Sequence, residues 1–384
     1  MTLKERPRME TTPVAGPYYL FLSAGCKWDY QIKRPHCLNL SPVSKRSLVE
    51  CFPSQGMCGN TFWISLRYNA HFGTWGPKFM KATYHPGIHR YALFVVCWTV
   101  ALLTAGALVT SEDAALAVPD WPLSYGTLNP PMVGGIAFEH SHRMIAAALG
   151  FLVIVLAFML WRKDERPGVR WLGAFAVAGV CLQGGLGGLT VLKLLHYWLP
   201  VMHACTAELV FALLVSIAVV TSRWWMENLP QYEDRGTPPI HSIVTLNAFV
   251  IFAQILAGAG FRHKYLSLKP HVYGAPLVLL MVVWTALVLR SRFPQVREMV
   301  RARVLLHSIV GIQILLGLTA LWARIQSAND PQPMPFMVFS TVVHTVVGAI
   351  LFAVSIVTVL LCYRLVPRNR EVLLATTRGE VPAQ

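Results

Sequence analysis

Long apolar runs alternate with short polar segments along most of this chain. Each run carries few or no charges and is long enough, at about 1.5 Å per residue in a helix, to cross most of a bilayer core. None alternates polar and apolar positions as a barrel strand does. Eight runs can be read: Tyr91–Thr110, Met144–Trp161, Trp171–Leu192, Leu199–Ser222, Ile243–Phe261, Val272–Leu289, Val304–Trp322 and Phe336–Tyr363. The pattern predicts an all-α integral membrane protein with eight transmembrane helices.

The composition agrees with this class. Of 384 residues, 55% are hydrophobic and 13% are charged, which is typical of membrane proteins rather than soluble domains. The net charge of +15 comes from basic residues scattered over loops. Because they do not follow one face, we expect contact with membrane lipid and no binding of nucleic acid.

The basic residues also predict the orientation. They crowd the loops 162–170 and 290–303 and the segment after residue 363, whereas the acidic loop 111–138 has no Lys or Arg. Since cytoplasmic loops carry the excess of Lys and Arg, we expect a multi-pass cell-membrane protein with cytoplasmic N- and C-termini. The loop holding Arg262, Lys264 and Lys269 breaks this rule on the outer side. Anionic ligand groups are one explanation for its charge.

The second half of the chain repeats features of the first. His142 and His271 begin equivalent helices, and His203 pairs with His344. The segment Ala105-Gly106-Ala107 recurs as Ala257-Gly258-Ala259, and Gly188-Leu189-Thr190 recurs as Gly317-Leu318-Thr319. A unit of four helices returns the chain to its starting side. The sequence therefore predicts two tandem four-helix bundles in a parallel pseudo-two-fold repeat.

The repeat sets the expected domain boundaries. Residues 80–226 would form the N-terminal bundle, 227–240 a linker, 241–366 the C-terminal bundle and 367–384 a cytoplasmic tail. Residues 1–79 lack a spanning run and are rich in Pro and Gly. We expect this extension to be disordered, or to be translated from an upstream start with Met80 beginning the functional protein.

Four histidines are the main candidates for chemistry. His142, His203, His271 and His344 each lie early in a helix that runs inward, so all four are expected in the outer half of the membrane. A histidine in a membrane span is a functional candidate by default, although any one could simply bond a neighbouring helix. Two imidazoles from facing helices supply the two axial ligands of haem iron. We interpret His140, His196, His241 and His263 as solvated.

Charged residues accompany these histidines. Glu139 lies three residues before His142, so both share one helix face. Arg143 and Arg262 are placed to contact haem propionates, although headgroup contact is an equally simple reading. Only the first bundle has both a carboxylate one turn before its histidine and a long covering loop. We therefore expect the chemistry in the first bundle and a permanent cofactor in the second.

These motifs together resemble the haem A synthase family. The resemblance rests on the loop 117–123, the cluster Glu139-His140-Ser141-His142-Arg143, the helix histidine His203, and Gly258-Ala259-Gly260-Phe261-Arg262-His263 followed by His271. It covers about residues 85–366. That family oxidises the C8 methyl group of haem O to a formyl group, giving haem A for terminal cytochrome oxidase.

The resemblance implies roles for individual residues. His142 and His203 would bind the substrate haem, His271 and His344 would be the axial ligands of a haem b cofactor, and Glu139 would be the essential acidic residue. It also implies haem O synthase and cytochrome oxidase assembly as partners. The electron acceptor, the oxygen source and a homo-oligomeric state stay open. Some members carry a cysteine pair in the first outer loop, which this chain lacks.

Other functions remain compatible with the same residues. A di-haem cytochrome b would use paired histidines only to pass electrons, and a haem carrier or assembly factor would bind haem without changing it. Transport is disfavoured by the parallel repeat and by the scarcity of charges within the spans, where Glu208 is the clear example.

Overall fold

A computed structural model describes residues 83–196 and 198–367 of the chain. These residues belong to one compact unit of the chain. The expectations for the extension 1–79 and, apart from Pro367, for the tail 367–384 concern residues outside the described ranges.

Helices make up the regular secondary structure of the described residues, with no β-strand among them. Their helices are α1 (Pro86–Ser111), α2 (Gly134–Lys163), α3 (Pro167–Leu192), α4 (Trp198–Val220), α5 (Arg223–Met226), α6 (Ile240–Arg262), α7 (Lys269–Arg292), α8 (Arg297–Gln326) and α9 (Pro335–Leu365). Eight are long and apolar enough to cross a membrane. The eight predicted spans are confirmed, and the short helix α5 is the additional element.

The helices extend beyond the apolar runs that predicted them. An apolar run records only the residues suited to hydrocarbon, whereas backbone hydrogen bonding continues into the polar headgroup layer. Helix α2 begins at Gly134, ten residues before the run that starts at Met144. The cluster 139–143 therefore lies inside the helix rather than at its start. Prolines begin α1, α3 and α9, where a missing backbone N–H costs nothing.

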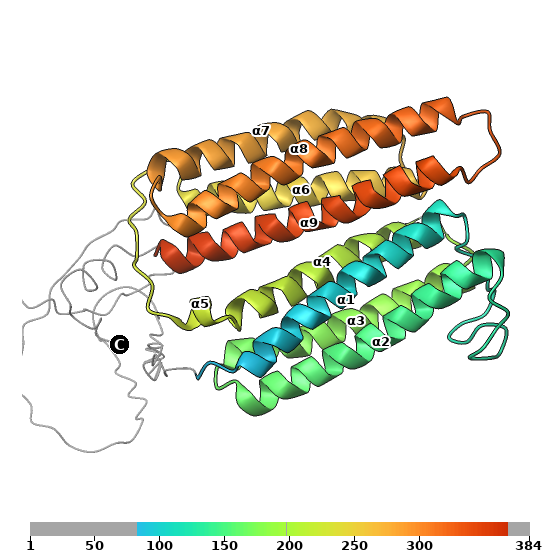
Figure 1. The fold of residues 1–384 in the computed structure, drawn as a ribbon, viewed down its shortest axis with the longest axis horizontal. Coiled ribbons are helices and arrows are strands. Elements are labelled where there is room, and N and C mark those ends of the chain that lie inside the picture. The colour runs from blue at the N-terminus through green and yellow to red at the C-terminus, as the bar shows by residue number, and fades with distance from the viewer. Residues whose placement is uncertain (1–82, 197, 368–384) are drawn as a thin grey trace, which may run out of the picture. The chain divides into compact units, whose positions relative to one another are not determined.

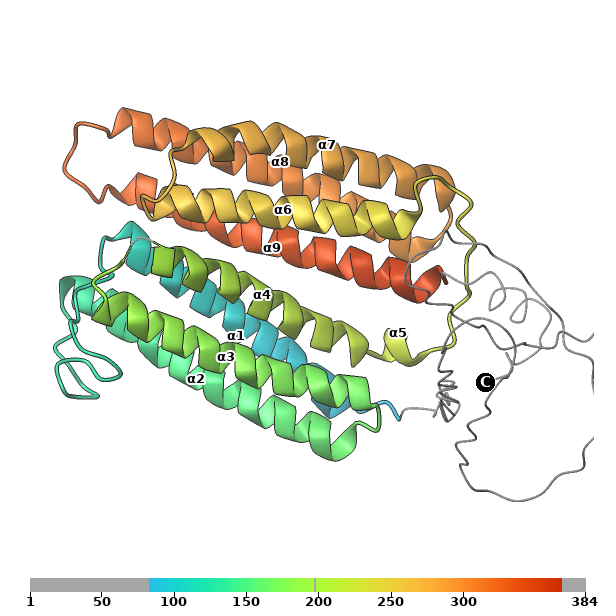
Figure 2. The same ribbon diagram turned by 180° about the vertical axis from the view of Figure 1, so that it is seen from behind.

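The spanning helices pack in two groups of four (Figures 1 and 2). Helices α1–α4 pack each on the next, with α1 against α4, and α6–α9 repeat this arrangement. Helix α9 packs against both α1 and α4, and α4 also touches α6. Buried aliphatic residues fill both groups, for example Leu156, Leu214 and Ile217 in the first and Val282 and Leu306 in the second. The two groups are thus joined chiefly through α4 and α9.

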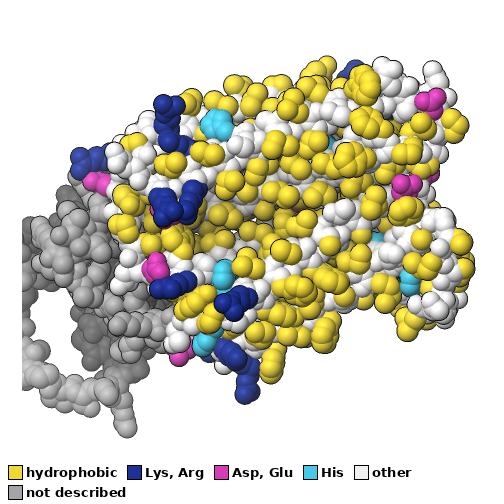
Figure 3. Space-filling model, in the orientation of Figure 1, with side chains coloured by type: hydrophobic (Ala, Val, Ile, Leu, Met, Phe, Trp, Pro, Cys, Tyr) yellow, Lys and Arg dark blue, Asp and Glu magenta, His cyan; other side chains and the backbone are white. Residues whose placement is uncertain are grey.

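The connections α1–α2, α3–α4, α6–α7 and α8–α9 all lie at one end of the helices, at the right in Figure 1. We call this the loop end. The face drawn in Figure 3 is largely apolar along the helices, and Lys and Arg gather toward the opposite end. Helices α2, α4, α7 and α9 start at the loop end, so the histidines early in them lie there as well.

Candidate functional site

Three residues of the α2 cluster hold the loop that joins α1 to α2. Glu139 is only 3% exposed. Its Oε1 accepts a hydrogen bond from Nη2 of Arg143 at 2.6 Å, and its Oε2 accepts one from the backbone N–H of Val118 at 2.8 Å. The carboxylate thus faces the loop and has a donor on each oxygen.

Arg143 spreads its guanidinium over the same loop. Nη1 donates to the carbonyl oxygens of Asp120 at 2.7 Å and Leu123 at 2.6 Å, and Nη2 also donates to that of Val118 at 3.2 Å. This side chain therefore binds loop backbone and Glu139 in the structure. Whether it contacts a propionate stays a prediction.

His140 was expected to be solvated, and that expectation is wrong. Its side chain is buried, and Nδ1 shares a hydrogen bond of 2.9 Å with Oγ of Ser124, itself a buried loop residue. The sequence showed His140 beside a helix start but not the fold of the loop above it. Glu139, His140 and Arg143 thus fasten the loop to α2.

The loop has internal order of its own. The Asp120 carboxylate accepts hydrogen bonds from the backbone N–H groups of Gly126 and Tyr125, and these bonds lower the pKa of Asp120. Trp121 reaches across to α3, where a Cβ on Gly188 would lie 2.8 Å from its indole ring. The loop therefore covers the loop end of the first group from α2 to α3.

Each of the four candidate histidines rests against a glycine of the preceding helix. A Cβ would lie 3.1 Å from Cε1 of His142 at Gly106, 3.2 Å from Cε1 of His203 at Gly187, 2.9 Å from Cε1 of His271 at Gly258 and 3.0 Å from Cε1 of His344 at Gly317. Any other residue would push into the imidazole. We call these glycines the histidine seats.

The seats revise one detail of the sequence comparison. The repeated Gly-Leu-Thr motif pairs Gly188 with Gly317, but the glycine under His203 is Gly187. Gly188 faces Trp121 instead. By their contacts with the histidines, Gly187 in α3 is equivalent to Gly317 in α8. This is a shift of one residue from the pairing of Gly188 with Gly317 that the motif favoured.

Glutamines that were not among the predicted site residues lie beside three of the four seats. Nε2 of Gln183 donates to the backbone carbonyl oxygen of His203 at 3.0 Å, Gln254 to that of His271 at 2.7 Å and Gln313 to that of His344 at 3.0 Å. Each glutamine stands four residues before its seat glycine. The recurring spacing Gln-x3-Gly, one helical turn, was the signal that could have found them.

The two histidines of the second group face one another. Their ring centres are 5.9 Å apart and the rings are perpendicular. A metal held axially between two imidazoles, with bonds of about 2 Å, sets the ring centres about 6 Å apart. Nδ1 of His271 lies 3.2 Å from the backbone oxygen of Gln254, and donation there leaves Nε2 as the ligand nitrogen. This pair fits haem iron.

The first group has the same kind of seats. His142 rests against Gly106, and His203 rests against Gly187. Nδ1 is buried in His142, His203 and His344 and has no hydrogen-bond partner among the described residues. Buried polar atoms normally have partners, so these Nδ1 atoms differ from that of His271, which has the Gln254 backbone oxygen beside it.

Arg262 lies between the two helix groups. From the end of α6 it donates to Oγ1 of Thr345 in α9 at 3.0 Å, and to the carbonyl of Ala107 at 2.6 Å and Oγ of Ser111 at 2.8 Å in α1. It forms no ion pair with a carboxylate of the described residues. Thr345 follows His344 and Ala107 follows Gly106, so this cation touches the surroundings of both histidine pairs.

Other polar groups lie apart from these pairs. Glu208 in α4 is buried, and its Oε2 lacks a hydrogen-bond partner within the described ranges. His263, expected to be solvated, is half-buried after α6, where burial and then the Arg262 guanidinium lower its pKa to about 4. His196 is exposed at the α3–α4 connection, as expected.

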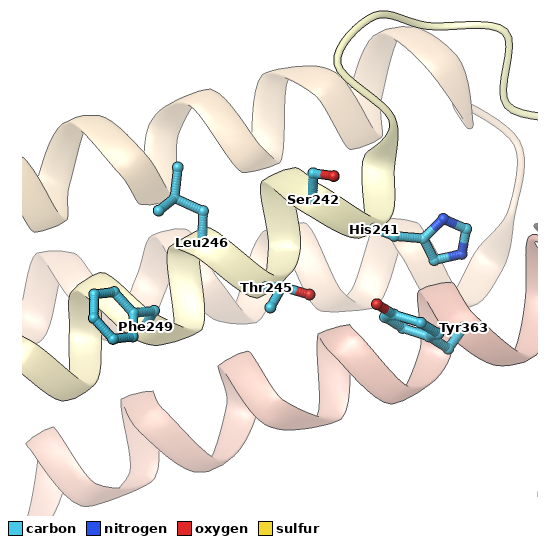
Figure 4. A pocket seen from close by; sticks show the side chains of 6 residues that line it. All are labelled: His241, Ser242, Thr245, Leu246, Phe249 and Tyr363. Atoms are coloured by element: carbon cyan, nitrogen blue, oxygen red, sulfur yellow. The ribbon is translucent and has the colours of Figure 1, made fainter. Parts of the chain in front are cut away.

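A surface pocket lies at the far end of α6 from the seats (Figure 4). It is lined by His241, Ser242, Thr245, Leu246, Phe249 and Tyr363. His241 is buried rather than solvated, which corrects the expectation. Its Nε2 bonds the carbonyl of Val366 at 2.8 Å, and its ring meets Tyr363 edge to face at 4.5 Å. These partners fasten α6 to α9, so we assign this histidine a structural role.

Comparisons with known proteins find similarity over parts of the chain. A family model described as cytochrome oxidase assembly protein matches residues 135–270. The chain is 28% identical over 191 residues to the haem A synthase of Shouchella clausii (strain KSM-K16), covering 48% of this chain and 62% of that protein. It is 35% identical over 140 residues to the haem A synthase of Caulobacter sp. (strain K31), covering 32% and 41%. The matches thus span about half the length of these relatives.

Fold and site together define a multi-pass, all-helical membrane protein with histidines seated on facing helices. The family match includes the α2 cluster, the first histidine pair and the start of α7. Over parts of its length, this chain is similar to proteins of the haem A synthase family.

Proposed function

We propose that this protein is a haem A synthase that oxidises the C8 methyl group of haem O to a formyl group. The observation that carries the proposal is the set of four histidines, each seated on a glycine at the loop end. Its support is the similarity to proteins named haem A synthase over parts of the chain. The product would serve the assembly of a terminal cytochrome oxidase, with a haem O synthase as the supplier of substrate.

The two histidine pairs would divide the work. His142 and His203 would bind the substrate haem O, and His271 and His344 would be the axial ligands of a haem b cofactor. The covering loop and Glu139 occur only in the first group, which favours the reaction there. The 5.9 Å separation of the second pair favours a resident cofactor. When bound, haem b would supply a one-electron redox centre.

The two groups would be tandem repeats related by an axis along the membrane normal. Their support is the matching use of seats, with Gly106 and Gly258 under the first histidine of each group and Gly187 and Gly317 under the second. The boundaries would be residues 80–226 and 241–366. Basic side chains at the end opposite the loops favour a cytoplasmic location for that end and haem sites in the outer half of the membrane (Figure 3).

Glu139 would be the catalytic acidic residue. Conversion of a methyl to a formyl group removes four electrons and adds one oxygen atom, so electrons must pass to an acceptor. Positive charge that develops on the carbon next to the porphyrin would be stabilised by a carboxylate, which could also take a proton from an incoming water. Arg143 and the Val118 N–H hold this carboxylate in a fixed position.

Propionate binding by the two arginines is the least direct part of the proposal. Arg143 already donates to three loop carbonyls and to Glu139, so its contact with a propionate would have to share these donors. Arg262 has hydroxyl and carbonyl partners but no carboxylate among the described residues. A haem propionate would supply the anion that this partly buried cation lacks.

The test is to express the full chain in a host that makes haem O but no haem A, and to separate the extracted haems by mass. We expect haem A or its hydroxylated precursor only with this protein, and neither with Glu139→Gln, which should retain bound haem. If haem O stayed unchanged beside protein carrying only haem b, the synthase proposal would be wrong and an electron-carrying cytochrome b would replace it.

A further inference from the structure

The four histidine positions differ in how firmly the neighbouring helix holds them. At three of them a glutamine amide donates to the carbonyl oxygen of the histidine itself, at 2.7 to 3.0 Å. We call each such bond a glutamine brace. It ties the backbone that carries the imidazole to the helix that carries the seat. Bonds that orient a ligand are a recognised determinant of how tightly a metal is held.

The brace is absent at His142. The position four residues before its seat Gly106 is Leu102, a partly buried apolar residue. No side chain of α1 donates to the His142 carbonyl among the described residues. The nearest substitute is Trp98, whose Nε1 donates at 3.1 Å to the carbonyl of Ile145, three residues further along α2.

Instead, the loop end of α2 is held by the covering loop. Glu139 and Arg143 flank His142 on either side and bond the segment 118–123 rather than another helix. His203, His271 and His344 are held through helix-to-helix bonds that do not involve this loop. The polar contacts around His142 therefore run to the loop, whereas each of the other three histidines is bonded to a neighbouring helix.

We propose that His142 is the exchangeable ligand, the one that leaves the iron when substrate haem enters and product haem departs. Gln183, Gln254 and Gln313 are positioning residues that fix the other three. This rests on the proposed function, and it names the part of the first site that opens. The step is ligand dissociation, in which the iron–nitrogen bond breaks and its electron pair stays on the imidazole.

The first group has one brace and the second group has two, and this difference suits a first site that releases its haem in each catalytic cycle. A substrate site must release its haem, whereas a cofactor site must retain it. In the second group both histidines are braced, and Gln254 and Gln313 lie over Gly274 and Gly348, where side chains would obstruct them. In the first group only His203 is braced.

The test adds the missing brace. The full chain is loaded with iron protoporphyrin, and its transfer to excess apo-globin is followed. Release in two phases is expected, and a His344→Ala variant identifies the phase of the second site by its loss. Leu102→Gln should slow the fast phase by about 3-fold to about 18-fold, the range for one hydrogen bond between membrane helices. Leu102→Met, of similar size but without a donor, should leave it unchanged.

Two further readouts keep the test independent of folding. Leu102→Gln should lower the fraction of high-spin haem at the first site, because a ligand that no longer leaves keeps the iron six-coordinate. Gln254→Leu should accelerate only the slow phase, and Gln183→Leu only the fast phase. These variants remove a brace rather than add one, so they test the inference even if Leu102→Gln fails to fold.

The outcomes separate the inference from the function on which it rests. Two-phase release with the same fast rate in Leu102→Gln and Leu102→Met would overturn the inference and leave the proposed function intact. If Gln183→Leu did not accelerate the fast phase and Gln254→Leu did not accelerate the slow phase, the inference would also be overturned and the proposed function left intact. Failure of the unaltered chain to take up haem at either site would overturn both.

Discussion

The seat under His344 offers the sharpest test of the histidine geometry. In Gly317→Ala the added Cβ would lie 3.0 Å from Cε1 of His344. Carbon atoms prefer separations of about 3.5 to 4.0 Å, so the imidazole must retreat by about 0.5 Å or more. Metal-ligand distances are held to within about 0.2 Å. The substitution should therefore remove axial ligation at the second site.

The effect on folding should be much smaller than the effect on haem. Overpacking costs about 1 to 3 kcal/mol, and replacing glycine by alanine within a helix returns about 1 kcal/mol. We expect little change in the thermal unfolding of haem-free protein. The ratio of bound haem to protein should fall by half, and the low-spin spectrum of one haem should disappear.

Gly311 in the same helix provides the matched control. A Cβ there meets nothing within 4 Å, so Gly311→Ala should keep the full haem content and unfold at an equal or higher temperature. The reasoning would be refuted if Gly317→Ala kept both haems with unchanged spectra. It would also fail if the Gly311 variant lost haem to the same extent.

Three further predictions concern charged groups. Arg143→Ala should free the loop between α1 and α2, because it removes hydrogen bonds from a charged group that contribute about 1.5 to 3 kcal/mol each. Hydrogen exchange of the Val118 amide should then rise at least tenfold. An unchanged exchange rate would contradict this. The pKa of Asp120 is lowered in the folded loop, so its carboxylate stabilises the loop fully above the ordinary pKa of 3.8. This stability is lost as the pH falls through the lowered pKa of the folded state. Hydrogen exchange of the Gly126 amide, corrected for its intrinsic rate, should therefore accelerate at acid pH in the unaltered chain but not in Asp120→Asn. Glu208→Met should raise the free energy of unfolding by about 1 kcal/mol or more, because it removes a buried oxygen without a partner among the described residues. A lower melting temperature of the variant would instead indicate that the carboxylate is stabilised.

The eight spans could be predicted because membrane helices are specified by length and apolarity, which are local properties. The four histidines could be singled out for the same reason, since their depth follows from their position in each run. Their proposed roles came from resemblance and stay proposals. The structure adds the glycine under each imidazole and the facing rings of His271 and His344.

The partners of the α2 cluster could not be predicted, because they lie on a loop without periodicity. Nothing in the spacing of His140 indicates that Ser124 closes over it, or that Glu139 bonds the Val118 amide. His241 was misread for a related reason, since its acceptor Val366 lies at the far end of another helix. The glutamine braces are different, because their spacing was visible in the sequence. They were missed because glutamine in a membrane helix was not treated as part of a repeat.

Arg262 has a consequence for how the chain assembles during synthesis. Its acceptors Ala107 and Ser111 belong to α1, which enters the membrane first, whereas Thr345 belongs to α9, which enters last. An arginine facing lipid is costly, so α6 has reason to dock on α1 as soon as it inserts. The first group thereby acts as a template for the second. Two halves expressed as separate chains, cut within the α5–α6 linker, should consequently associate in the membrane through the packing of α4 and α9, with Arg262 adding a polar contact to α1.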